Sequence, residues 1–174
     1  MIASEADAQA WLRALPEGDD AAMARLARLT AMLVAENSRQ NLVSAASLGE
    51  VWRRHIADSA QLLRYVPREG GSPWLGLGTG AGFPGLVIAA LRPECEVIMV
   101  ESRARRIAWL EQVCADLGLA RARVEGARLE LVESRPFRVI SARAFAPLDK
   151  LVGLAARFST SDTLWLLPKG RSAA

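Results

Sequence analysis

One glycine-rich stretch decides the fold of this chain: Leu77-Gly78-Thr79-Gly80-Ala81-Gly82-Phe83-Pro84-Gly85. It follows an apolar run, Trp74 to Leu77, that predicts a strand, and it precedes an apolar segment that predicts a helix ending at Arg92. Glycines in such a turn adopt positive φ and let a ligand approach the backbone. Pro84 suits the first helical turn, where a missing N–H costs nothing. A strand, a glycine turn and a helix form the context that nucleotide binding requires.

An acidic residue follows at the spacing that this interpretation needs. Glu101 ends the next predicted strand, Glu96 to Val100, about 20 residues after the loop, where an acid accepts the hydroxyls of an adenosine ribose. The loop itself fits two ligand classes. Gly80 to Gly85 matches the dinucleotide pattern GxGxxG, whereas Gly78-x-Gly80-x-Gly82 is the GxGxG turn of S-adenosylmethionine-dependent methyltransferases. A nicotinamide-dependent oxidoreductase also needs a substrate domain, and little sequence remains for one.

The rest of the second part alternates between strand and helix patterns. Further strands are predicted at Arg121 to Glu125, Phe137 to Ser141 and Thr163 to Leu167. Helices are predicted at Arg103 to Leu117, closed by Gly118 as a left-handed cap, and at Leu148 to Phe158. This alternation predicts an α/β fold with a mostly parallel sheet.

The first 66 residues predict helices only. The first runs from Glu5 to Leu15, and Asp19 or Asp20 caps the second. The third opens with Ser47 and Glu50 in capping-box spacing. Apolar faces are expected at Met23, Leu26, Leu29, Leu33 and Val34, and at Val51, Ile56, Leu62 and Leu63. Because Pro67 to Pro73 breaks the pattern, we expect a helical region, 1–66, packed on a core, 73–174, as one compact unit.

Composition narrows the class of protein. The chain has 174 residues, 51% of them hydrophobic, which suits a single domain with a large core. Its two cysteines show no metal-ligand spacing, so no metal site is expected. No apolar run reaches the roughly 18–20 residues of a membrane span, and the N-terminus lacks the basic start of a signal peptide. A cytoplasmic protein without a membrane segment is therefore expected. The net charge of +3, with a pI near 9.4, favours an anionic partner.

Several short segments, in order along the chain, resemble one family. The chain is similar to the bacterial small-subunit (16S) ribosomal RNA guanine-N7 methyltransferases, also called the glucose-inhibited division protein B family. The matching segments are Asn41-Leu42, Arg54 to Ser59, Gly78 to Gly85, Glu101-Ser102 with Arg105-Arg106, Arg128 to Glu130, Ala142 to Leu148 and Pro168 to Gly170. Two positions depart from the family: Gly76 stands where an acid usually precedes the loop, and Arg138 stands where the fourth strand usually carries an acid.

The resemblance implies a Rossmann-like class I methyltransferase fold with an N-terminal helical extension. It implies methyl transfer from S-adenosyl-L-methionine to N7 of a guanine in 16S ribosomal RNA or in a small ribosomal subunit precursor, by a monomer. Cofactor contacts then fall on Gly78, Phe83, Leu129, Glu130 and Arg143, and general methyltransferase patterns add Gly80, Gly82 and Glu101. RNA contacts are assigned to Arg54, His55, Arg103, Arg106 and Lys169. His55 has a structural alternative, in which Asp58 holds its imidazole on the helix, and Arg143 has one as a surface ion pair.

No catalytic acid or base is expected, because guanine N7 already presents a lone pair. The departures at Gly76 and Arg138 motivate an alternative, a non-catalytic RNA-binding module on the same fold. An oxidoreductase is the third possibility. Proteins of this type resemble a seven-stranded sheet, so we also expect that the C-terminal strand pair is missing here and that Thr163 to Leu167 forms a sheet edge.

Overall fold

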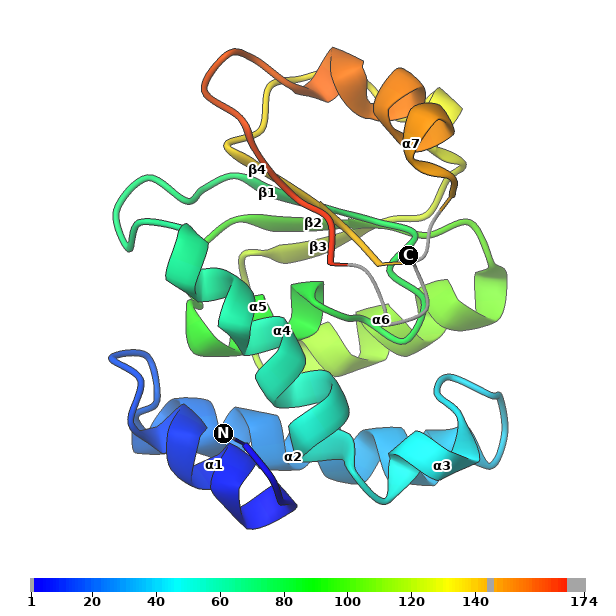
Figure 1. The fold of residues 1–174 in the computed structure, drawn as a ribbon. Coiled ribbons are helices and arrows are strands. Elements are labelled where there is room, and N and C mark those ends of the chain that lie inside the picture. Colours follow the sequence, from blue (N-terminus) through cyan, green and yellow to red (C-terminus); the bar gives the residue numbers. More distant parts are fainter. Residues whose placement is uncertain (1, 144–145, 169–174) are drawn as a thin grey trace.

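The computed structural model describes residues 2–143 and 146–168, and it shows a five-stranded, all-parallel sheet (Figure 1). The strand order is β3-β2-β1-β4-β5. The strands are β1 (Trp74–Leu77), β2 (Val97–Val100), β3 (Ala122–Glu125), β4 (Val139–Ala142) and β5 (Leu164–Leu166). All five lie where the sequence predicts strands, which confirms the α/β class. Because β1 is central, the glycine loop that follows it opens at the middle of the sheet.

Alternating side chains divide the core between the two faces of the sheet. Leu75, Leu77 and Ile140 pack on one face, towards α7 (Leu148–Ala155) and the 3₁₀ turn η4 (Ala156–Phe158). Trp74 and Met99 pack on the other face, towards α5 (Gly85–Leu91) and α6 (Ala104–Asp116). Figure 1 shows α7 above the sheet and α5 and α6 below it. The apolar side chains of the strands therefore divide between two hydrophobic clusters, one on each face.

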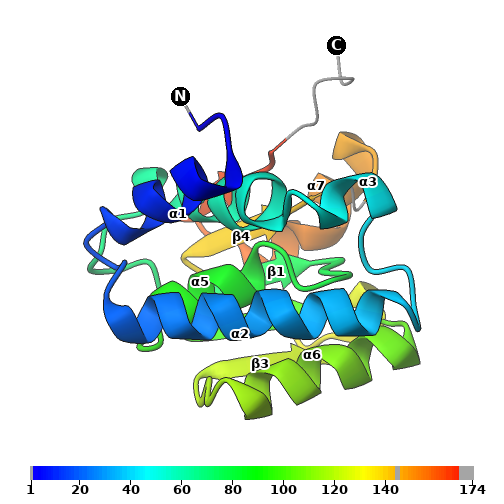
Figure 2. The same cartoon turned by 90° about the horizontal axis from the view of Figure 1, so that it is seen from below.

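The N-terminal helices form an outer layer below α5 and α6 (Figures 1 and 2). They are α1 (Glu5–Arg13), which begins with a capping box between Ser4 and Asp7, and α2 (Asp20–Asn37), capped by the carboxylate of Asp19. Apolar residues at helical spacing in α2 are buried, as predicted, except Val34, which is 48% exposed. The prediction for Val34 is wrong because its side chain lies outside the stripe that faces α5.

The third helical segment differs from the prediction. Ser44, not Ser47, caps the short α3 (Ala45–Leu48), and its hydroxyl accepts the backbone N–H of Ser47. The segment continues as a π-helical turn η1 (Trp52–Ala57), α4 (Asp58–Ala60) and the 3₁₀ turn η2 (Gln61–Tyr65). The capping-box prediction is wrong because the Ser47 hydroxyl donates to the Ser44 carbonyl, while Glu50 pairs with the two arginines that follow it.

A carboxylate from another helix holds the π-helical turn in place. The Glu5 side chain accepts the backbone N–H groups of Trp52 and Arg53 at 3.0 and 2.9 Å. Further along, the Ser59 hydroxyl donates to the His55 carbonyl at 2.6 Å, a bond that competes with the regular helical ladder. The predicted apolar face at Val51, Ile56, Leu62 and Leu63 is buried. Residue packing was therefore predicted correctly here, and helix type was not.

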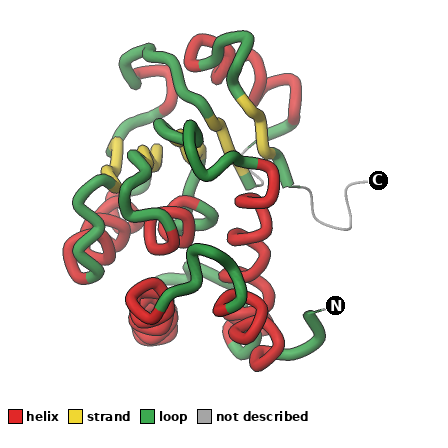
Figure 3. Tube along the Cα trace, turned by 90° about the vertical axis from the view of Figure 1, so that its left-hand side faces the viewer, coloured by secondary structure: helices red, strands yellow, loops and turns green. Residues whose placement is uncertain are grey.

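Strand β5 lies at the edge of the sheet (Figure 3). Within residues 2–143 and 146–168 it pairs with β4 alone, so the strand count agrees with the prediction. In this same part of the chain no helix is long and apolar enough to cross a membrane.

Candidate functional site

A cavity of about 220 Å³ opens at the carboxyl ends of β1 and β2. Its lining includes five residues that the sequence singled out, namely Gly78, Glu101, Leu129, Arg103 and Arg106. The parallel order of the strands explains this convergence, because all strand ends of one polarity meet at one edge of the sheet. The cavity has an apolar wall from Val100 and the buried Leu129, and a buried carboxylate from Glu101.

The glycine loop bends sharply at the mouth of this cavity. Gly78 and Gly80 have φ values of +55° and +57°, a left-handed backbone that glycine adopts without strain. A Cβ atom on Gly80 would lie 3.0 Å from Nη1 of Arg106, so that guanidinium covers the turn. Gly82 has a different role: a Cβ there would lie 2.2 Å from Leu86 Cδ1, so this glycine permits close packing against α5.

Glu101 holds the loop through its carboxylate. One oxygen accepts the Gly80 N–H at 2.9 Å, and the other accepts the N–H groups of Ser102 and Arg103 at 2.9 and 3.0 Å. A carboxylate offers about four lone-pair sites, so these three bonds leave one. We expected Glu101 to accept both ribose hydroxyls. Because backbone N–H groups of the loop and of the segment after β2 already occupy three lone-pair sites, only one site remains for a ribose hydroxyl.

Trp109 is a loop-holding residue that the sequence analysis missed. Its indole N–H, on α6, donates to the Ala81 carbonyl at 2.8 Å, and the ring is almost fully buried. Glu101 and Trp109 therefore fix the loop from two sides. The available signal was a tryptophan on the apolar face of a helix, which predicts burial but not a particular partner.

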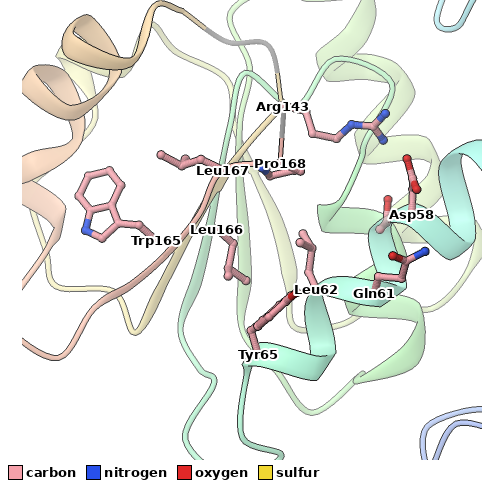
Figure 4. A pocket seen from close by; sticks show the side chains of 10 residues that line it. Asp58, Gln61, Leu62, Tyr65, Arg143, Trp165, Leu166, Leu167 and Pro168 are labelled. Carbon is pink, nitrogen blue, oxygen red and sulfur yellow. The ribbon is translucent and has the colours of Figure 1, made fainter. Parts of the chain in front are cut away.

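A second cavity, of about 410 Å³, lies between the N-terminal region and the β5 edge (Figure 4). Arg143 reaches it from the end of β4, and Asp58, Gln61 and Tyr65 line it from α4 and η2. Nη1 of Arg143 is buried and has no hydrogen-bond partner within the described part of the chain. The ion-pair alternative for Arg143 is therefore not supported among these residues.

His55 lies at the junction of the N-terminal region and the glycine loop. Its ring stacks on Phe83, with 5.1 Å between ring centroids, and its Nε2 lies 2.9 Å from the Ser47 hydroxyl. The alternative in which Asp58 holds the imidazole is not found, because Ser47 lies at Nε2 and Nδ1 has no partner among the described residues. Phe83 is buried in this stack and does not line the smaller cavity.

Two further candidates, Arg54 and Glu130, line neither cavity. Arg54 pairs with Glu50, and Glu130 forms a long ion pair of 3.5 Å with Arg128. Lys169 lies outside the described residues. The roles assigned to these residues stay predictions.

The two departures from the family pattern have different surroundings. A Cβ atom on Gly76 would meet only ordinary contacts, the nearest being Thr79 Oγ1 at 3.6 Å, so no clash requires glycine there. Arg138 precedes β4 at the end opposite the cavities, where it donates to the Gly70 carbonyl and pairs with Asp162. Its charge is therefore remote from the site.

Comparison with known proteins agrees with this geometry. The family described as rRNA small subunit methyltransferase G, GidB, matches residues 22–174. The chain belongs to this family. A relative from Erythrobacter litoralis named ribosomal RNA small subunit methyltransferase G is 59% identical over all of this chain and 83% of its own length. A relative of the same name from Novosphingobium aromaticivorans is 56% identical over 99% of this chain and 75% of its own length.

Solved structures place this GidB family member in the methyltransferase fold. Coclaurine N-methyltransferase, solved with N-methylheliamine and SAH, aligns with a TM-score of 0.57 at 18% identity, over 95% of this chain and 60% of its own. The YcgJ protein of Bacillus subtilis aligns with a TM-score of 0.56 at 20% identity, over 65% of this chain and 50% of its own. The predicted family and fold are both confirmed.

Proposed function

We propose that this chain transfers a methyl group from S-adenosylmethionine to N7 of a guanine in 16S ribosomal RNA. One observation carries the proposal: in a GidB family member, the predicted loop, acid and apolar wall meet in a single cavity at the carboxyl ends of β1 and β2. That the relatives are named for methylation of small-subunit ribosomal RNA supports the substrate class. Such a substrate would place the chain in the cytoplasm.

The residues of the smaller cavity fit the adenosine part of the methyl donor. Leu129 and Val100 provide an apolar surface for a flat base, and Glu101 keeps a lone pair for a ribose hydroxyl. The positive φ of Gly78 and Gly80 keeps side chains out of the approach. Bound there, the donor supplies an electrophilic methyl group on a sulfonium.

The larger cavity fits the target nucleotide in this proposal. The exposed ring of Tyr65 provides a stacking surface for an unstacked base. Arg143 lines this cavity, and its Nη1 has no partner among the described residues, so its guanidinium suits the guanine O6 acceptor and leaves the N7 lone pair free. No residue has to remove a proton, so the chain acts by holding N7 and the methyl group in line.

The test starts with calorimetry of S-adenosylhomocysteine against the whole chain, followed by methyl transfer to 16S RNA. Primer extension after N7-specific cleavage should show one new stop that requires both protein and S-adenosylmethionine. RNA binding without binding of the methyl donor would instead support the non-catalytic module. Quenching of NADH fluorescence on addition of the chain would support the oxidoreductase.

A further inference from the structure

A third cavity, of about 330 Å³, lies beside the larger one, between α1 and η2. The described residues that line it are Ile2, Trp11, Gln61 and Arg64. Gln61 also lines the larger cavity, so the two spaces share this residue as a boundary. A chain molecule that enters one space therefore has the other within reach.

The 3₁₀ geometry of η2 explains why neighbouring residues serve different cavities. Side chains three positions apart lie on one face of a 3₁₀ helix. Gln61 and Arg64 share one face and line the third cavity. Leu62 and Tyr65 share the next face and line the larger cavity, where Figure 4 shows them. The turn therefore separates the two spaces and contributes to the lining of both.

Trp11 contributes to the lining of the third cavity from α1. Glu5, on the same helix, accepts the backbone N–H groups of Trp52 and Arg53, which fixes α1 against the segment that leads into η2. The Arg64 guanidinium lies over the Trp11 ring, with 5.9 Å between Cζ and the ring centroid. The indole is partly buried, whereas Arg64 is exposed. The two side chains therefore form a joint surface on elements that are held together.

This surface combines a flat ring with a free positive charge. Within the described part of the chain Arg64 forms no ion pair, and none of the described residues that line the cavity is acidic. A guanidinium that lies over an aromatic ring keeps its N–H donors for a phosphate. Single-stranded RNA is held by such surfaces, because its bases stack on aromatic rings and guanidinium planes. The lining therefore suits a nucleotide of a single strand.

We propose that the third cavity is a second RNA subsite, which holds the nucleotide next to the target guanine. Its base stacks against Trp11 and Arg64, the guanine occupies the larger cavity, and Gln61 lies between the two nucleotides. The inference rests on the proposed function for the identity of the strand and extends it from one nucleotide to two. Because stacking does not read base edges, this subsite adds affinity and accepts any base.

Fluorescence anisotropy tests the subsite with a short oligouridine RNA that carries one central guanosine, in the presence of S-adenosylhomocysteine. Arg64→Ala should lower the affinity about 10-fold. Trp11→Leu keeps an apolar side chain but removes the flat ring, and it should lower the affinity by about as much. The matched control is Arg13→Ala, on the same helix as Trp11, which removes an exposed arginine that is paired with Asp20 and should leave the affinity unchanged. Thermal denaturation checks that each variant is folded.

Abasic RNA separates stacking from a general loss of charge or stability. An abasic site is placed on each side of the guanosine in turn. With the unmodified chain, one of these two positions should lower the affinity about 10-fold. With Trp11→Leu the same abasic site should lower it little further, because the base and the ring act as a pair. Additive losses at both positions, a loss in Arg13→Ala as large as in Arg64→Ala, or no binding of the oligonucleotide by the unmodified chain would overturn the proposal.

An abasic site in place of the guanosine itself tests the larger cavity separately. Unchanged affinity there would count against the proposed place of the guanine, whereas coupling between Trp11 and a neighbouring base would still support the second subsite. Methylation of 16S RNA by a chain that shows no such coupling would leave the proposed function standing and refute the second subsite alone.

Discussion

Single residues in this molecule divide into those that hold the loop and those that face the cavities. Glu101 and Trp109 hold the loop, and their bonds to backbone groups tie ligand binding to stability. Arg143 differs, because its buried Nη1 has no partner within residues 2–143 and 146–168. Because the structure gives this atom no partner among the described residues, replacing Arg143 should have little effect on folding.

Arg143→Ala should therefore reduce turnover by about 10²-fold, the effect of removing one preorganised donor from an active site. Its melting temperature should stay near that of the unmodified chain. Steady-state methylation and thermal denaturation, measured on the same preparation, check both expectations. A loss of stability with unchanged activity per folded molecule would contradict the assignment.

Gly80 allows a comparison at matched backbone strain. Gly80→Ala and Gly118→Ala both place a side chain at a positive φ, +57° and +64°, and each should cost about 1–2 kcal/mol of unfolding free energy. A Cβ at Gly118 has open space, whereas one at Gly80 meets the Arg106 guanidinium at 3.0 Å beside the smaller cavity. Calorimetry should show weaker binding of S-adenosylhomocysteine in Gly80→Ala alone. Equal affinities in the two folded variants would contradict the site.

At the scale of elements, one buried ion pair joins the N-terminal region to the core. Arg92, at the end of α5, donates two bonds to Glu17 in the α1–α2 connection, with both side chains only 6% exposed. The same guanidinium also donates to the carbonyls of Val66 and Pro67. The Arg92 side chain therefore joins the end of α5 to the α1–α2 connection and to the segment that follows η2.

Arg92→Met should lower the free energy of unfolding by about 3–5 kcal/mol, because it leaves the Glu17 carboxylate buried without a partner. The double variant Glu17→Leu/Arg92→Met should recover part of that loss. Arg13→Ala breaks an exposed pair with Asp20 and should change stability by about 0.5 kcal/mol or less. Urea denaturation measures all three. A change as small in Arg92→Met as in Arg13→Ala would show that the pair does not join these segments.

At the scale of the whole molecule, the net charge of +3 predicts RNA binding that weakens moderately with salt. Each phosphate contact adds roughly 0.7 to the slope of log affinity against log salt for a single strand. Arg103→Ala, beside the smaller cavity, should lower the slope by about one such step. Arg28→Ala removes an arginine that is paired with Asp116 and should leave the slope unchanged. Fluorescence anisotropy over a KCl series checks this, and an affinity independent of salt would contradict a role for the arginines.

The sequence by itself determined the strands, their parallel direction and the position of the glycine loop. Five short strand patterns, separated by helical patterns, admit little besides parallel strands, and the glycines mark where the backbone must turn left-handed. Gly78 and Glu101 could be assigned to one cavity in advance because each follows a strand, and parallel strands end at one edge. Leu129 was assigned to it by the resemblance to the family. The separation of five residues between Val51 and Ile56 was a signal of the π-helical turn that the helical interpretation overlooked.

Only the tertiary structure decided which side chains meet across long distances in the chain. The bonds of Glu101 to the loop amides, the stack of His55 on Phe83, and the Glu17–Arg92 pair follow no periodicity that a sequence displays. Such contacts depend on how the helices pack on the sheet and on one another. If a helix slid along its axis by one turn, its side chains would meet different partners. Local pattern therefore sets the elements, and packing sets the chemistry of each polar group.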